Sequence, residues 1–227
     1  FDAAGAVAGA RGRVTVGAQR KIDTALELME RHVDVADLVA QLSIPIPTVT
    51  TPQMFEYELI ERARADRKRI VLPEGDDDRI LQAAGRLLRR EVADLTILGD
   101  ETRVRARAAE LGLDLAKATV LDPRTSELCD RFAEQYAQLR RKKGVTVEQA
   151  REIIYDVSYF GTMLVHNDMV DGMVSGAAHT TAHTVRPALE IIRTRPDVST
   201  VSSIFLMCLA DRVLAYGDCA IVPDPTA

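Results

Sequence analysis

The sequence predicts an α/β fold with a mainly parallel sheet. Short apolar runs alternate with longer segments in which apolar residues recur at helical spacing, a pattern typical of parallel strands joined by helices. Glycine, proline or aspartate stands within two residues after each apolar run, where a strand would turn toward the next element. Hydrophobic residues make up 47% of the 227 positions, enough for a substantial core. We therefore expect an α/β domain built around a mainly parallel sheet.

The first part of the chain has a different character. After a glycine-punctuated start, helical spacing predicts one helix with inner residues Ile22, Ala25, Leu26, Met29 and Val33, and a second, short helix over 35–42. Residues 43–52 hold three prolines and are expected to form a linker. We expect residues 1–42 to be the tail of an upstream domain, and residues 53–227 to belong to a second domain.

From residue 53 onward the elements follow one another regularly. Apolar spacing predicts a helix over 54–66 with inner residues Met54, Leu59, Ile60 and Ala63. A strand over 69–73 precedes a helix that opens at Asp76–Asp78, where acidic residues suit the helix dipole. Further strands are predicted at 95–98, 119–121 and 170–174, and further helices at 101–111, 126–143 and from Thr146.

Near the end of the chain, two apolar runs are separated by three residues. The runs are 204–209 and 213–216, and so short a connection predicts a hairpin. We expect it to add an antiparallel strand to the parallel sheet.

Small and acidic residues close the predicted strands. They are Pro73–Gly75, Gly99–Asp100, Asp122–Pro123, Ser175–Gly176 and Gly217–Asp218. Ligands of open parallel sheets bind beyond the carboxyl ends of the strands, so these residues would line a binding edge. Ordinary turns favour the same residue types, and the pattern alone leaves both interpretations open.

The segment 171–187 is the strongest candidate site. Ser175 and Gly176 follow a strand, and Thr180 stands where the next helix begins. Small residues allow close backbone approach, amides at a helix start attract anions, and Arg186 adds a planar cationic fork. The segment predicts a phosphate or carboxylate pocket; the alternative is an ordinary turn with a threonine cap.

Composition and motifs argue against several classes of function. The net charge of −5 without a basic block disfavours nucleic-acid binding, and no apolar run approaches the ~20 residues that span a bilayer. Cys129, Cys208 and Cys219 are scattered, which fits a reducing cytoplasm, and Cys208 is expected in the core. His179 and His183 lack a third ligand and the adjacent glutamate of a metalloprotease, so no metal site is predicted.

A basic run closes the predicted helix over 126–143. Arg140 to Lys143 are all cationic, which suits a helix C-terminus without any function. The functional alternative is a grip on a polyanionic ligand, with Arg186 and Arg193 on the same rim.

Motifs along the chain resemble the phosphate acetyltransferase family. They are 51–56 (TPQMFE), 70–75 (IVLPEG), 139–144 (LRRKKG), 170–179 (VDGMVSGAAH), 184–188 (TVRPA) and 216–220 (YGDCA). The resemblance runs from about Thr51 to Ala227, and residues 1–42 are more loosely similar to the long bacterial form, truncated here at both ends.

The resemblance implies a fold of two α/β/α domains flanking a cleft, as in isocitrate and isopropylmalate dehydrogenases, with the second domain incomplete. It implies a cytoplasmic, homo-oligomeric enzyme of acetate metabolism that transfers an acetyl group between acetyl phosphate and coenzyme A, releasing phosphate. Coenzyme A is a substrate, and no permanent cofactor is expected. Arg140 and Arg186 would help bind coenzyme A or the acyl phosphate, with Ser175 and Gly176 at the cleft.

The resemblance also implies what the chain lacks. The family's proposed base, an Asp, and its neighbouring Ser-Arg pair lie in a C-terminal part, so no catalytic residue is expected here and this chain alone should be inactive. His183 departs from the Asn or Asp often found in the family. A non-catalytic acetyl-CoA sensor of the kind fused to malic enzymes and a phosphate butyryltransferase remain alternatives; motifs 51–56 and 216–220 favour the acetyl enzyme.

Overall fold

A computed structural model describes residues 19–32, 34, 49–219 and 221. Contacts divide the chain into two units, residues 1–49 and residues 50–227. In the first unit the structure describes helix α2, Gln19–His32, which confirms the predicted helix around Ile22 and Leu26. The predicted helix over 35–42, Val33 and most of the predicted linker lie outside the described residues.

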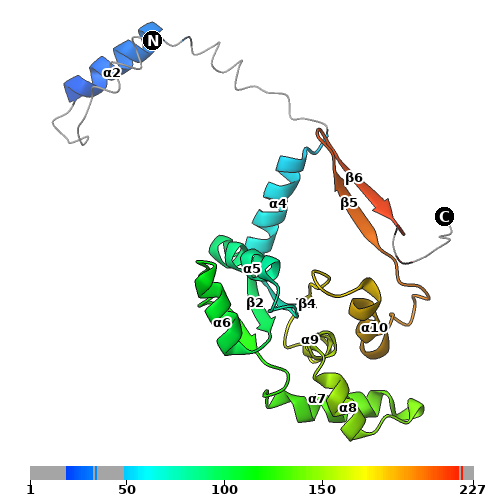
Figure 1. Ribbon diagram of the computed structural model, residues 1–227. Coiled ribbons are helices and arrows are strands. Elements are labelled where there is room, and N and C mark those ends of the chain that lie inside the picture. Colours follow the sequence, from blue (N-terminus) through cyan, green and yellow to red (C-terminus); the bar gives the residue numbers. More distant parts are fainter. Residues whose placement is uncertain (1–18, 33, 35–48, 220, 222–227) are drawn as a thin grey trace. The chain divides into compact units, whose positions relative to one another are not determined.

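The second unit is built on a four-stranded sheet (Figure 1). Its strands are β1 (Lys68–Leu72), β2 (Ala93–Leu98), β3 (Thr119–Leu121) and β4 (Gly172–Met173). They lie in the order β3-β2-β1-β4 and all neighbouring pairs are parallel, as predicted. The chain moves outward from β1 to β3 and then returns to the other side of β1. The connection reverses direction between β1 and β4, and such a switch point is where open α/β sheets bind ligands.

Helices cover both faces of this sheet. Helices α5 (Asp78–Arg90) and α6 (Glu101–Glu110) cover one face, and α7 (Leu128–Leu139), α8 (Val147–Ile154) and α9 (Val157–His166) build the layer on the other. Successive residues of β1 face opposite layers: Val71 packs with Phe160 of α9, and Leu72 with Leu81 of α5. This alternation follows from the pleat of a strand and makes the unit a three-layer α/β/α structure.

Polar side chains fix where the helices begin. Asp77 caps α5 by accepting the N–H of Arg79, and Asp156 caps α9 by accepting the N–H groups of Ser158 and Tyr159. Thr146 forms a capping box at α8. The predicted helix over 126–143 is interrupted after Leu139, and Arg141–Lys143 form a 3-10 turn, η1. Gly144, at φ +74, ends it in the left-handed region that glycine accepts readily.

Helix α4, Pro52–Ala65, forms as predicted but is not buried. None of its residues is buried, and Leu59, predicted to face inward, is 47% exposed. Helical spacing fixes which residues share a face, but it does not say whether another layer covers that face.

The predicted hairpin forms, but its place in the fold was predicted wrongly. Strands β5 (Ile204–Cys208) and β6 (Val213–Gly217) pair with each other as a separate two-stranded sheet. Among the described strands, β5 pairs with β6 alone, so the hairpin adds no strand to the β3-β2-β1-β4 sheet. All of β5 is exposed, so Cys208 is not a core residue. Asp218 therefore does not join the edge of the parallel sheet.

None of the helices in the described part of the chain is long and apolar enough to cross a bilayer.

Candidate functional site

Four of the five predicted strand ends meet at one edge of the sheet. Strands β1 to β4 are parallel, so their carboxyl ends, and the residues that follow them, lie along the same edge. Gly75 donates its N–H to the carbonyl of Leu98, and Gly99 to that of Leu121, which ties these ends together. A hollow of about 350 Å³ opens here, lined by Pro73–Asp77, Leu98, Gly99, Val157, Ala178 and His179.

Glu74 occupies the amide-rich loop that was predicted to bind an external anion. Its Oε2 accepts the N–H groups of Gly176 (3.0 Å) and Ala177 (2.9 Å). Its Oε1 accepts those of Ala178 (2.7 Å) and His179 (2.9 Å) and lies 2.9 Å from the Nδ1 of His179. The loop does bind a carboxylate, but the carboxylate belongs to the protein. The four amides are therefore used within the protein, and the substrate pocket predicted for segment 171–187 stays a prediction.

The Glu74 carboxylate is held as an anion. Its side chain is 1% exposed, and burial alone would raise its pKa. Hydrogen bonds from the backbone N–H groups of Ala178, Ala177 and His179, and from the His179 ring, outweigh burial and lower the pKa to about 2. The charge is therefore retained throughout the physiological range.

Beyond this loop begins helix α10, Thr181–Ile191, which carries Arg186. Thr180 is its N-cap and accepts the N–H of His183. Within the described residues, no acceptor contacts the N–H groups of Thr181 and Ala182 at the first turn. Ser175 accepts the hydroxyl of Thr184 at 3.4 Å. The free donors thus lie at the start of α10, next to the loop that Glu74 fills.

Arg186 is exposed and lies near Tyr159. Burial raises the pKa of Tyr159, and the positive charge of Arg186 offsets part of that rise. Among the described residues, no carboxylate lies within ion-pair distance of its guanidinium. Arg186 is the middle residue of α10, four positions after Ala182, so this cation stands one helical turn beyond the free amides of the first turn.

Arg140, the other predicted arginine, is ion-paired. Its Nη2 lies 3.5 Å from Oε1 of Glu190, and both side chains are 22% exposed. Tyr136 (2.7 Å) and Tyr159 (3.1 Å) donate their hydroxyl hydrogens to Oε2 of the same carboxylate. The Nε of Arg140 is buried without an acceptor in the described part of the chain. Arg186 precedes Glu190 by one helical turn, so the structure places both predicted arginines around the same end of the fold.

The rest of the basic run is exposed. Arg141, Lys142 and Lys143 point to solvent in η1, whereas Arg193 donates from Nη2 to the carbonyl of Leu139 at 3.5 Å. Arg193 therefore reaches the end of α7 beside Arg140, as the idea of one basic rim requires.

The two histidines do not form a metal site. Their rings stack with centroids 4.6 Å apart, and each contacts a separate carboxylate: His179 contacts Glu74, and His183 contacts Asp156 through Nε2 at 2.9 Å. No cluster of three potential metal ligands occurs among the described residues.

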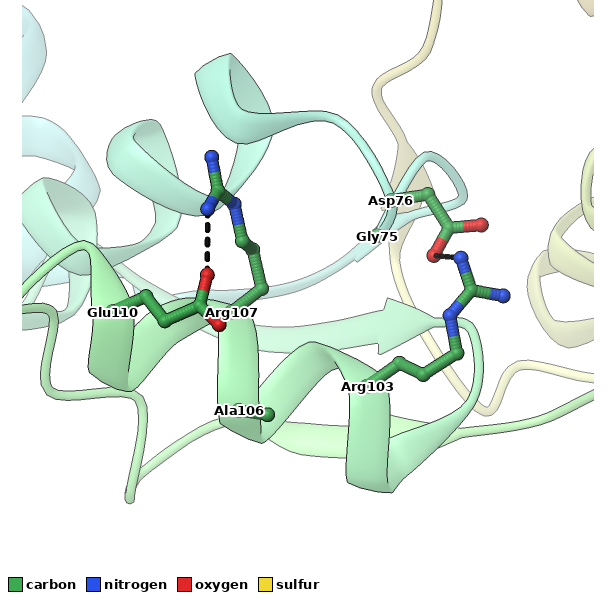
Figure 2. Close-up of a pocket in the computed structure, with 6 residues that line it drawn as sticks. All are labelled: Gly75, Asp76, Arg103, Ala106, Arg107 and Glu110. Carbon is green, nitrogen blue, oxygen red and sulfur yellow. Dashed lines mark hydrogen bonds and ion pairs between the residues drawn. The ribbon is translucent and has the colours of Figure 1, made fainter.

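A second hollow lies behind the same strand end and is lined by Gly75, Asp76, Arg103, Ala106, Arg107 and Glu110 (Figure 2). Figure 2 shows its charges paired: Arg103 lies 3.3 Å from Asp76, and Arg107 lies 2.6 Å from Glu110. Because both arginines that line this hollow are paired with carboxylates, it is a weaker candidate for anion binding than the start of α10.

Two site residues escaped the sequence reasoning. Glu74 belongs to the predicted strand end Pro73–Gly75, but nothing in the neighbouring sequence indicated that it would bind amides 102 residues away. Glu190 was not singled out; an acidic residue between Leu189 and Ile191 was the available signal.

Comparisons with known proteins identify relatives of this chain. The family model described as phosphate acetyl/butaryl transferase matches residues 54–227. The phosphate acetyltransferase of Nitratidesulfovibrio vulgaris is 52% identical over 95% of this chain and 31% of its own length. That of Corynebacterium glutamicum is 57% identical over 77% of this chain and 53% of its own length. The chain thus spans about half, or less, of these curated relatives.

Solved structures are similar as well. A phosphotransacetylase from Streptococcus pyogenes matches 78% of this chain and 54% of its own with a TM-score of 0.73 and 38% identity. The EutD phosphotransacetylase from Staphylococcus aureus matches 74% of this chain and 52% of its own with a TM-score of 0.67 and 43% identity. Since the family model covers most of the chain and the switch-point motifs lie within it, the chain belongs to the phosphate acetyl/butaryl transferase family.

Proposed function

We propose that this chain is part of a phosphate acetyltransferase, which reversibly transfers an acetyl group between acetyl phosphate and coenzyme A and releases phosphate. The names of its relatives support this activity. The observation that carries it is Arg186, which has no ion-pair partner among the described residues, on the helix that follows the switch point and whose first turn holds the free N–H groups of Thr181 and Ala182. A cation and helix-start amides suit the phosphate of acetyl phosphate.

Arg140 is proposed to serve coenzyme A. Its buried Nε lacks an acceptor in the described part of the chain, and its pairing with Glu190 holds the guanidinium in place. The neighbouring Arg141–Lys143 turn supplies exposed positive charge that suits the phosphates of coenzyme A. Ser175, Gly176 and Thr180 are proposed to form the wall of the substrate cleft, although Gly176 also binds Glu74 and Thr180 also caps α10.

The proposed chemistry needs no nucleophile from the protein. The thiol of coenzyme A loses its proton to a carboxylate, and the thiolate attacks the acetyl carbonyl of acetyl phosphate. The tetrahedral intermediate then collapses, the bond to the phosphate oxygen breaks, and inorganic phosphate leaves. Arg186 stabilises charge on the leaving phosphate, where an oriented cation is worth most. We assign the thiol base to none of the described residues.

The finer architecture is also a proposal. Two domains of the isocitrate dehydrogenase type would place the substrate cleft at the switch-point edge, with the β5–β6 ribbon belonging to the second domain. The similarity to solved phosphotransacetylases supports this arrangement. A cytoplasmic homo-oligomer is proposed on the same resemblance.

The test is a thioester assay on the full-length gene product with coenzyme A and either acetyl or butyryl phosphate. The proposal expects acetyl-CoA formation, with kcat/KM higher for acetyl phosphate than for butyryl phosphate. Preference for butyryl phosphate would instead support the butyryltransferase. Binding of acetyl-CoA without turnover would support the sensor.

A further inference from the structure

Glu74 binds a whole segment of backbone rather than a single partner. Its two oxygens accept four consecutive N–H groups, from Gly176 to His179, at 2.7 to 3.0 Å. Successive N–H groups of this kind form a concave anion site, and the His179 ring closes one side of it. Each of these N–H groups already donates to Glu74, so the four donors are not free for a second anion.

Glu74 is itself rigidly mounted. The next residue, Gly75, donates to the carbonyl of Leu98 at 3.1 Å, and Asp77 donates to the carbonyl of Glu74 at 3.1 Å. A Cβ on Gly75 would lie 2.4 Å from the Leu98 oxygen, so the backbone here is packed directly on the end of β2. The carboxylate therefore projects from a fixed point on the central strands.

The segment that Glu74 holds leads directly into the proposed substrate residues. Thr180, the N-cap of α10, follows His179, and Arg186 lies on the same helix. His183, in the first turn of α10, stacks on the ring of His179. Moving the 176–179 backbone would therefore move the start of α10 and its free amides with it.

We propose that Glu74 is a positioning residue, a built-in anion that fixes the 176–179 loop and directs the substrate phosphate to Thr181 and Arg186 instead of to the loop amides. The inference rests on the proposed acetyltransferase function. Beyond the contribution of Glu74 to overall stability, this role predicts an effect on one loop that depends on negative charge at one point.

The first test is Glu74→Gln in the full-length gene product, with Asp171→Asn as the matched control. Asp171 also joins β1 to the β4 segment, through the N–H and guanidinium of Arg69, but it contacts none of the loop amides. We expect Glu74→Gln to speed hydrogen exchange at the amides of 176–179 at least tenfold. We expect kcat/KM for acetyl phosphate to fall about 100-fold, the scale expected for a small misplacement of binding groups. Asp171→Asn should leave hydrogen exchange at 176–179 unchanged.

The second test is rescue. Glu74→Ala leaves a space that a small carboxylate can enter, so added formate should restore slow exchange at 176–179 and part of the lost activity. Chloride at the same ionic strength should not.

Unchanged exchange and unchanged kcat/KM in Glu74→Gln would overturn the positioning role. So would a loosened loop with wild-type kinetics. Wild-type protein without acetyl transfer would overturn the proposed function instead, and the exchange measurement would still report on the loop by itself.

Discussion

Tyr136 on α7 donates its hydroxyl hydrogen to Glu190 on α10 over 2.7 Å, across 54 residues of sequence. This bond connects α7, which Arg140 follows directly, with α10, which carries Arg186. Burial, followed by the hydrogen bond to Glu190, raises the pKa of Tyr136 well above its usual range, so the phenol remains a donor at neutral pH. Tyr159 packs edge-on against the Tyr136 ring and donates to the same oxygen.

Tyr136→Phe should lower the free energy of unfolding by about 1 kcal/mol, because it removes a donor from a charged acceptor that keeps a second phenol and Arg140. Urea denaturation at pH 7 measures the change. Tyr57→Phe is the control: Tyr57 is 66% exposed, and its loss should fall within about 0.5 kcal/mol of zero. Equal effects at the two positions would contradict the assigned bond.

The stability of the protein should depend on pH through Glu74. The folded pKa of about 2 lies below the ordinary value of 4.5, so the unfolded chain takes up the proton first as the pH falls. The stabilising contribution is complete above about pH 4.5 and is lost as the pH falls toward 2. The difference between the two values corresponds to roughly 3 kcal/mol.

Denaturation of wild type and Glu74→Gln at several pH values from 7 to 3 checks this sign. Wild type should be more stable at pH 7, and the gap should narrow below pH 4.5. If the difference in unfolding free energy between wild type and Glu74→Gln stays constant or widens in acid, Glu74 does not have a lowered pKa.

Gly75→Ala should destabilise the site edge. Its methyl group would lie 2.4 Å from the carbonyl oxygen of Leu98 and 2.8 Å from a methyl of Ile97, and the backbone must move to admit it. We expect a loss of about 1–3 kcal/mol, the usual range for overpacking. Gly172→Ala is the matched control, since its methyl would meet Ile70 at an ordinary 3.5 Å. Similar midpoints for the two variants would argue against the close approach of β1 and β2 at this edge.

Local pattern was sufficient for the parallel core. Strands β1, β2 and β3 and the helices between them were predicted within a few residues because their apolar spacing and aspartate caps are local signals. Coverage by other layers is not local. The apolar residues of β5 and of α4 repeat as core residues would, yet the described residues leave β5 and Leu59 exposed.

The site divides in the same way. The sequence indicated an anion pocket in segment 171–187, and within that segment the structure shows four amides that bind a carboxylate of the protein itself. Which carboxylate it is could not be predicted, because Glu74 and Ala178 are 104 residues apart. The pairing of Arg140 with Glu190 is equally remote in sequence and depends on how α7 and α10 pack.

The most direct measurement is kcat/KM for acetyl phosphate in the full-length gene product carrying Arg186→Ala. The proposed role predicts a fall of about 10²–10³-fold, the scale for losing one oriented group that stabilises developing charge. Arg195→Ala is the control, because this exposed arginine pairs with Asp197 and has no proposed role. An Arg186→Ala enzyme as active as the Arg195→Ala enzyme would contradict the account that phosphate binds at the start of α10.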